Sequence, residues 1–506
     1  MSVATRPRLR TKTGCLTCES EPSTYGRVAA NLQKQADGAG RNATRSYPSV
    51  ETAALLVASA SGRHPQTCLI AAMHLTQHHG TEQQKRLISM ESIPHWFDPG
   101  PWNAPSEAAV AHRVMSQDLE LRISRHFVDK YYSLLILPSC HPGFHDGWLA
   151  EIQELMVTYK SLYYSVLACA ATHIYLVDAS QRMKDLALTF YSGAVKELSN
   201  LLKSVPELEN HNGLLMSVML LYLHGVMSWD TEIDCPQHVH AAARILTLRL
   251  LRRPVGIGRL FDRLAIESVM YQMFGMMTGL WSDSTQADYK FDLSFWEGAE
   301  KLLGRSTLLP GASRGFDSPV LGIPVSLFRT VLSLRQYFRS GGSPDPQNLS
   351  RVQADVSAWE AQVLSDQSLL PGSPPETEGP NPREKYVEDA CYLFAMVASL
   401  LLEQISQSDI VPRLPMMVSR DCWQARLGMQ ILEQNAYDER WTRSFIANWP
   451  IYTLGLFLES DADRKSIQVE FRRRWDLTKF TQVTHFRCDL EDIWAARDGK
   501  VCEELE

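Results

Sequence analysis

This sequence of 506 residues lacks the signatures of the common enzyme classes. It contains no Gly-x-Ser-x-Gly nucleophile elbow and no His-Glu-x-x-His zinc motif, and it has neither a Gly-x4-Gly-Lys-Ser/Thr nor a Gly-x-Gly-x-x-Gly phosphate-binding loop. Adjacent carboxylates occur only as surface-like neighbours, such as Glu491 and Asp492. We therefore predict that the protein is not an enzyme.

Strand patterns and membrane-spanning segments are also absent from the sequence. No run of four to eight residues combines apolar–polar alternation with β-branched residues, so we predict an all-α fold. The longest apolar runs, 214–226 and 390–402, hold 13 residues each, against the roughly 20 needed to span a bilayer. We expect them to form buried helices and expect no membrane contact. No apolar segment follows the basic N-terminus, which predicts that no secretory signal is present.

The sequence has neither the cysteine pattern of a disulfide-rich secreted protein nor a net positive charge. The ten scattered cysteines do not form a secreted disulfide framework, and Cys169 and Cys391 lie in apolar runs where buried thiols are expected. A formal net charge of −7 argues against nucleic-acid binding by the body of the chain. Residues 1–46 differ, because eight lysines and arginines stand there against three acids. Such a basic arm is typical of a solvated, disordered tail.

The remaining pattern predicts an N-terminal arm and linker followed by a large, irregular helical array. Residues 19–116 are rich in Ala, Ser, Gly, Gln and His, which indicates a mostly disordered linker. Apolar residues recur at helical spacing from 117 to 506, without an internal repeat. We expect turn-rich connections at 310–324 and 371–382. The predicted helices cover about 123–134, 148–157, 161–177, 181–202, 214–229, 239–251, 260–280, 325–339, 347–366, 384–406, 417–435, 440–459, 462–476 and 484–497.

Cys15 and Cys18 form the motif of the N-terminal arm that points to metal chemistry. A Cys-x-x-Cys turn can present two thiolates to one metal, and structural zinc takes four ligands. The next cysteine is Cys68, so Cys15 and Cys18 supply half of a tetrahedral site. Zinc is therefore expected as a cofactor only if residues missing from this sequence complete the cluster.

The stretch Arg10-Thr-Lys-Thr-Gly-Cys-Leu-Thr-Cys18 resembles the opening of the binuclear zinc-cluster DNA-binding domain of fungal transcription factors. The resemblance implies zinc binding by Cys15 and Cys18 and DNA phosphate contacts by Arg8, Arg10 and Lys12. In that family a basic, base-contacting helix and four more cysteines follow. Here Glu19-Ser-Glu-Pro follows instead, so residues 1–18 are a remnant of the motif.

A second resemblance covers most of residues 117–506. The block Leu214-Leu-Met-Ser-Val-Met-Leu-Leu-Tyr-Leu-His-Gly225 is similar to a helix of the fungal-specific transcription factor domain, and other blocks follow in the order of that domain. These blocks are 126–132, 162–171, 234–244, 318–328 and 449–455. The resemblance implies a nuclear transcription regulator, in a setting such as a metabolic or biosynthetic gene cluster. Its expected partners are DNA, other transcription proteins and a second copy of the chain.

The incomplete cluster leaves three alternatives open. In the first alternative, the sequence lacks an exon or has a misplaced splice site after Cys18, and the natural protein binds DNA specifically. Alternatively, the protein has lost its cluster and acts as a co-regulator through other proteins. In the third alternative it is an effector-binding or enzymatic helical protein that reuses the fold, because function lies in sites rather than folds.

Five side chains between residues 224 and 240 form the candidate metal group of the helical region: His224, Asp234, Cys235, His238 and His240. Residues two apart point to different sides of a helix, so His238 and His240 cannot readily share a metal. We expect structural histidines at these positions. His173 lies on an apolar helix, where a hydrogen-bonded core histidine is expected.

Two further runs have a structural and a functional interpretation. The arginines 472–474 could contact phosphate, but Ile467, Phe471 and Trp475 make the other helix face apolar. We therefore expect the arginines to form the solvated face of that helix. The methionine-rich run 270–277 is expected to lie in the core.

Overall fold

The computed structural model describes residues 118–204, 207–228, 230–252, 256–282, 289–306, 308–309, 316–341, 345–365 and 385–499. The predicted linker 19–116 lies outside these ranges, and so do Cys15, Cys18, Arg8, Arg10 and Lys12.

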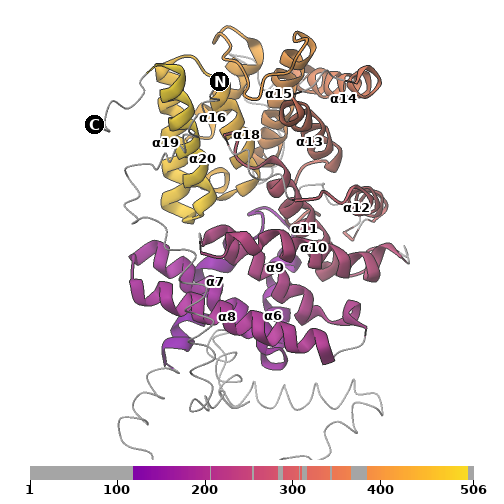
Figure 1. The fold of residues 1–506 in the computed structure, drawn as a ribbon, viewed down its shortest axis with the longest axis vertical. Coiled ribbons are helices and arrows are strands. Elements are labelled where there is room, and N and C mark those ends of the chain that lie inside the picture. The colour runs from indigo at the N-terminus through magenta and orange to yellow at the C-terminus, as the bar shows by residue number, and fades with distance from the viewer. Residues whose placement is uncertain are drawn as a thin grey trace, which may run out of the picture. The chain divides into compact units, whose positions relative to one another are not determined.

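The described residues form helices and no sheet, which confirms the all-α prediction (Figure 1). One isolated bridge pairs Val418 with Leu458. From residue 142 onward, the α-helices of the described residues are α6 (Pro142–Thr158), α7 (Lys160–Asp178), α8 (Gln181–Ser204), α9 (Asn212–Met227), α10 (Cys235–Leu246), α11 (Leu260–Thr278), α12 (Leu293–Arg305), α13 (Val325–Ser340), α14 (Pro346–Ser365), α15 (Lys385–Ser406), α16 (Trp423–Gln434), α17 (Glu439–Arg443), α18 (Asn448–Phe457), α19 (Asp461–Thr478) and α20 (Thr481–Arg497).

Two groups of helices meet around α9 and α11. α7 packs on α8 and α9, and α6 contacts α7, α9 and α11. In the second group α15 contacts α13, α14, α16 and α18, while α20 packs on α18 and α19. α11 contacts α13, and α20 contacts α9, so α11 and α20 link the two groups. In Figure 1 the first group is drawn in violet and magenta and the second in brown to yellow.

The first predicted helix changes its winding before it ends. Residues 118–126 are α-helical. A π-helical segment, η2 (Phe127–Tyr131), and a 3-10 turn, η3 (Tyr132–Leu134), follow. Tyr131 and Tyr132 are adjacent in the chain and both fully buried. Single π turns inside helices often mark functional sites, and Tyr131 lines the pocket described below.

The structure departs from the predicted helices at α12, within residues 440–459 and at the start of α16. The helix α12 was not predicted, although its buried residues recur at helical spacing. The prediction of a continuous helix over 440–459 is wrong, because Ser444 adopts an extended backbone and separates α17 from η9 (Phe445–Ala447) and α18. The start of α16 lies at Trp423 rather than at residue 417, because the N–H of Val418 donates to the carbonyl of Phe457 at 2.8 Å.

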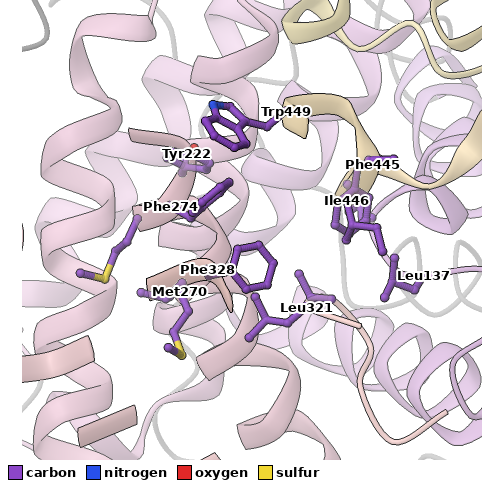
Figure 2. Close-up of a cluster of buried hydrophobic side chains, with 14 of the residues drawn as sticks. Leu137, Tyr222, Met270, Phe274, Leu321, Phe328, Phe445, Ile446 and Trp449 are labelled. Carbon is purple, nitrogen blue, oxygen red and sulfur yellow. The ribbon is translucent and has the colours of Figure 1, made fainter. Parts of the chain in front are cut away.

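Aromatic rings fill the core where α11, α13, α15 and α18 meet. The ring of Phe274 lies edge-on to the rings of Phe328 and Trp449, with centroid separations of 4.9 Å and 5.5 Å (Figure 2). Edge-to-face pairs of this kind add to the free energy of burial. The helix α15 has the length and composition of a membrane span, and it is longer than the apolar run seen in the sequence. Its most apolar window is 83% buried against other helices, as expected of a core helix.

Candidate functional site

Three members of the candidate metal group, His224, Asp234 and His238, lie around Tyr191. The Tyr191 hydroxyl donates to Asp234 Oδ2 at 2.7 Å and lies 3.0 Å from His238 Nε2. His224 stacks on the ring of Tyr191 and lies 2.9 Å from the hydroxyl of Thr231. Burial lowers the pKa of His224 to about 3 and also lowers the pKa of His238, so both imidazoles are neutral at pH 7. These contacts give the histidines a structural role.

The two other members of that group have separate surroundings. Cys235 is buried, and its thiol donates to the carbonyl of Tyr222 at 3.8 Å. His240 is exposed beside the ring of Tyr289. Among the described residues no three His, Cys, Asp or Glu side chains are arranged to hold a metal ion.

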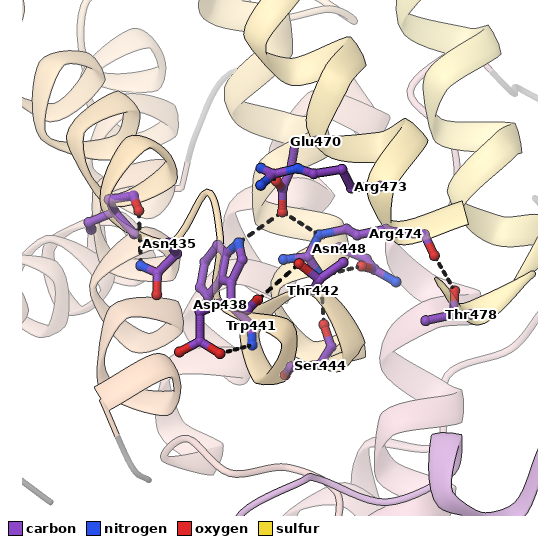
Figure 3. A network of polar contacts seen from close by, with 11 residues as sticks. Asn435, Asp438, Trp441, Thr442, Ser444, Asn448, Glu470, Arg473, Arg474 and Thr478 are labelled. Atoms are coloured by element: carbon purple, nitrogen blue, oxygen red, sulfur yellow. Dashed lines mark hydrogen bonds and ion pairs between the residues drawn. The ribbon is translucent and has the colours of Figure 1, made fainter. Parts of the chain in front are cut away.

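The prediction for the arginines 472–474 is correct for Arg472 and wrong for Arg474. Arg472 is exposed, whereas Arg474 is fully buried. The Arg474 guanidinium donates to Glu470 Oε1 at 2.8 Å, to the carbonyl of Ser444 at 2.6 Å and to Asn448 Oδ1 at 2.9 Å (Figure 3). Because Glu470 lies one turn earlier on α19, the pair forms within the helix and can be buried together.

Two expectations for core residues are confirmed. His173 is buried and hydrogen-bonded through both ring nitrogens, to His126 and to the carbonyl of Thr478. Met270 and Met273 are fully buried on α11, while Met276 and Met277 are half-buried and pack against the core.

A buried carboxylate fixes the loop before α13. Glu267 Oε2 accepts hydrogen bonds from the Ser318 hydroxyl at 2.6 Å and from the N–H groups of Val320 and Leu321 at 3.0 Å each. Its Oε1 accepts from Arg263 Nε at 2.5 Å. Glu267 is therefore a structural anchor, and the loop that it fixes places Val320 in the wall of the apolar pocket described next.

The best candidate for a binding site is an apolar pocket where the two helix groups meet. Its cavity measures about 100 Å³. α9 and α11 supply most of the wall, η2 and η3 another part, and residues 480–482 close it from the C-terminal side. The lining residues are Tyr131, Leu134, Leu135, Trp148, Met219, Leu220, Tyr222, Leu223, Val226, Met227, Ser268, Tyr271, Gln272, Gly275, Val320, Phe445, Phe480, Thr481 and Gln482.

Hydrogen bonds hold the two sides of this pocket together. The Thr481 hydroxyl donates to the carbonyl of Val226 at 2.6 Å. The Tyr271 hydroxyl donates to the carbonyl of Phe445 at 3.0 Å. Figure 2 shows Tyr222 and Phe445 on the separate segments that contribute to the wall. The site therefore depends on contacts between residues more than 170 positions apart, which no local sequence pattern reveals.

A second hollow at the start of α6 and α11 measures about 280 Å³. Glu151 and Arg259 line it and form an ion pair at 3.4 Å. The charges in this hollow already have partners, whereas the apolar pocket contains a buried polar atom, Gln272 Oε1, that has none.

Comparison with known proteins gives the family of this chain. Residues 122–504 match the fungal specific transcription factor domain. Neither the curated proteins nor the solved structures contain a significant match. The family match spans most of the chain and coincides with the helical body described above, as the sequence blocks predicted. Such a family implies a regulator rather than an enzyme. The chain therefore belongs to the fungal-specific transcription factor domain family and is a fungal transcription regulator.

Proposed function

We propose that this protein acts in the nucleus and controls transcription through its helical domain, in a setting such as a metabolic or biosynthetic gene cluster. The observation that carries the proposal is the family match over residues 122–504. The described helices support it, because they form one continuous core over the residues that match the family. The partners that we propose are other transcription proteins, DNA and a second copy of the chain.

For the sequence as it stands, we favour regulation through partner proteins over independent DNA recognition. Cys15 and Cys18 supply two of the four ligands that a zinc ion needs, and Glu19 stands where the family has a basic helix. Arg8, Arg10 and Lys12 are proposed to contact phosphates weakly. Contacts of this kind weaken steeply as the salt concentration rises.

A tethering experiment tests the regulatory role. The full chain is fused to an unrelated sequence-specific DNA-binding domain, and a reporter carrying the matching site is measured in a fungal host. We expect a change in reporter expression relative to the DNA-binding domain alone, and accumulation of the tagged full chain in the nucleus. Unchanged expression from a fusion that is present in the nucleus would contradict the proposal.

Zinc content and DNA binding separate the two versions of the proposal. The purified full chain is expected to hold close to no zinc, and its binding to duplex DNA should disappear at high salt. An intact cluster would instead give about two zinc ions per chain and salt-resistant, sequence-selective binding. Genomic DNA after the codon of Cys18 provides a further test, because a missing exon would encode a basic helix and four cysteines.

A further inference from the structure

We propose that the pocket between α9, α11 and residues 480–482 binds a neutral, mostly apolar molecule of about one aromatic ring that carries a hydroxyl group. The proposal concerns binding by the helical domain and does not rest on the role in transcription.

The lining of the pocket selects a neutral ligand. None of its lining residues carries a formal charge, and leucine, methionine, valine and aromatic side chains make up most of the wall. An ionised carboxylate or amine would lose its hydration there without gaining a partner of opposite charge, which is strongly unfavourable. Apolar walls with a few polar groups are typical of small-molecule sites.

One buried polar atom among the lining residues selects a hydroxyl group. Gln272 is only 4% exposed, and its Oε1 has no hydrogen-bond partner. The hydroxyl of the fully buried Tyr131 is already hydrogen-bonded to the thiol of Cys169, which does not line the pocket. A buried polar atom without a partner is destabilising, and a ligand hydroxyl can donate a hydrogen bond to Gln272 Oε1.

The size of the pocket and its open side limit the ligand. A cavity of roughly 150 Å³ is known to hold benzene, and this one measures about 100 Å³. The lining residues Leu223, Val226, Phe480 and Gln482 are only half-buried and mark the side open to solvent. The cavity is smaller than the one that encloses benzene, so a one-ring ligand must leave part of its volume at the open mouth.

The position of the pocket gives the ligand a structural consequence. One wall comes from α9 and α11, and the facing wall comes from Phe445 and residues 480–482. A bound ligand would contact both walls and stabilise their association, because it binds the folded state alone.

Three one-ring probes of similar size test the proposal on the purified full chain. These are 4-methylphenol, toluene and benzoate, each studied by calorimetric titration and by thermal unfolding. We expect saturable binding of 4-methylphenol and toluene with an increase in the unfolding temperature, and no binding of benzoate. Absence of saturable binding by 4-methylphenol, or benzoate binding as tightly as 4-methylphenol, would overturn the proposal.

Substitutions of lining residues locate the site. Gln272→Leu removes the unpartnered acceptor and should weaken 4-methylphenol binding about tenfold, while toluene binding stays the same or improves. An equal loss of binding for both probes in this variant, or no loss for 4-methylphenol, would contradict the proposed hydroxyl recognition.

A matched pair of glycine variants tests the location without removing a polar group. The Cβ of an alanine at residue 275 would meet only the Tyr222 hydroxyl, at an ordinary 3.5 Å, so Gly275→Ala should fold and fill part of the pocket. We expect this variant to bind both 4-methylphenol and toluene more weakly. Gly304 lies on α12, and a Cβ added there would meet nothing within 4 Å. Gly304→Ala should therefore leave the binding of both probes unchanged. Unchanged binding by folded Gly275→Ala would exclude this pocket.

Discussion

The imidazoles of His126 and His173 are hydrogen-bonded to each other, with His126 Nε2 2.8 Å from His173 Nδ1. His173 Nε2 lies 3.2 Å from the carbonyl of Thr478, which can only accept, so this nitrogen carries a proton. His173 Nδ1 must then accept the proton of His126 Nε2. Both rings are neutral, and together they connect the first described helix to the end of α19.

This pair predicts that the protein becomes less stable as pH falls below about 6.5. Burial lowers the pKa of His173 to about 4, and it also lowers the pKa of His126 despite the nearby Asp178. The unfolded chain therefore binds more protons than the folded chain between pH 4 and 6.5, so stability is full above this window and is lost within it. Urea unfolding midpoints at pH 7.5, 6 and 5 should fall in that order.

The variant His173→Gln tests the contribution of this ring. It should reduce the pH dependence by up to about one proton. The remaining dependence comes in part from His224 and His485, whose pKa values burial lowers to about 3 and about 4. A midpoint that does not change from pH 7.5 to 5 would contradict the assignment of neutral buried histidines.

The buried pair of Glu470 and Arg474 should be strongly coupled. Glu470→Gln leaves the Arg474 guanidinium buried without its counter-charge, so we expect a loss of about 3–5 kcal/mol in the free energy of unfolding. The double variant Glu470→Gln/Arg474→Met should lose less than the sum of the two single variants. Denaturant unfolding of all four proteins measures the coupling. Additive losses would show that the two charges do not depend on each other.

Glu267 should control the opening of the loop before α13. Glu267→Gln replaces one carboxylate oxygen with a donor that faces other donors, so we expect a loss of about 3–5 kcal/mol. Hydrogen exchange at the N–H groups of Val320 and Leu321 should accelerate. Glu300→Gln is the control, because Glu300 pairs with the exposed side chain of Arg329 at 3.0 Å and should contribute about 1 kcal/mol or less. Equal effects of the two variants would contradict the anchoring role.

Gly213 should not tolerate a side chain. A Cβ at this position would overlap the ring of Tyr159, which packs against the start of α9. We expect Gly213→Ala to lower the free energy of unfolding by about 1–3 kcal/mol. Gly304→Ala has open space and gains helix propensity, so it should raise stability by up to about 1 kcal/mol. Thermal unfolding compares the two, and a stable Gly213→Ala protein would contradict the observed packing.

The sequence by itself determined the all-α class, the family and most helix positions. The all-α class and the helix positions depend on local spacing, as on α9, where the apolar run ends close to Met227. The family followed from the resemblance of the sequence blocks and from the match over residues 122–504. Helix breaks were harder to predict when they depended on distant contacts. The bridge of Val418 with Leu458 delays α16, and Ser444 separates α17 from η9 while its carbonyl accepts from Arg474.

Only the tertiary structure decided which side chains share a site. The triple arginine looked like a solvated face, yet Arg474 is buried because Trp441, Ser444 and Asn448 of other segments surround it together with Glu470. The pocket likewise joins Tyr131, Gln272 and Thr481, which lie far apart in the chain. Periodicity shows which face of a helix is apolar, but it cannot show which distant segment covers that face or leaves a gap there.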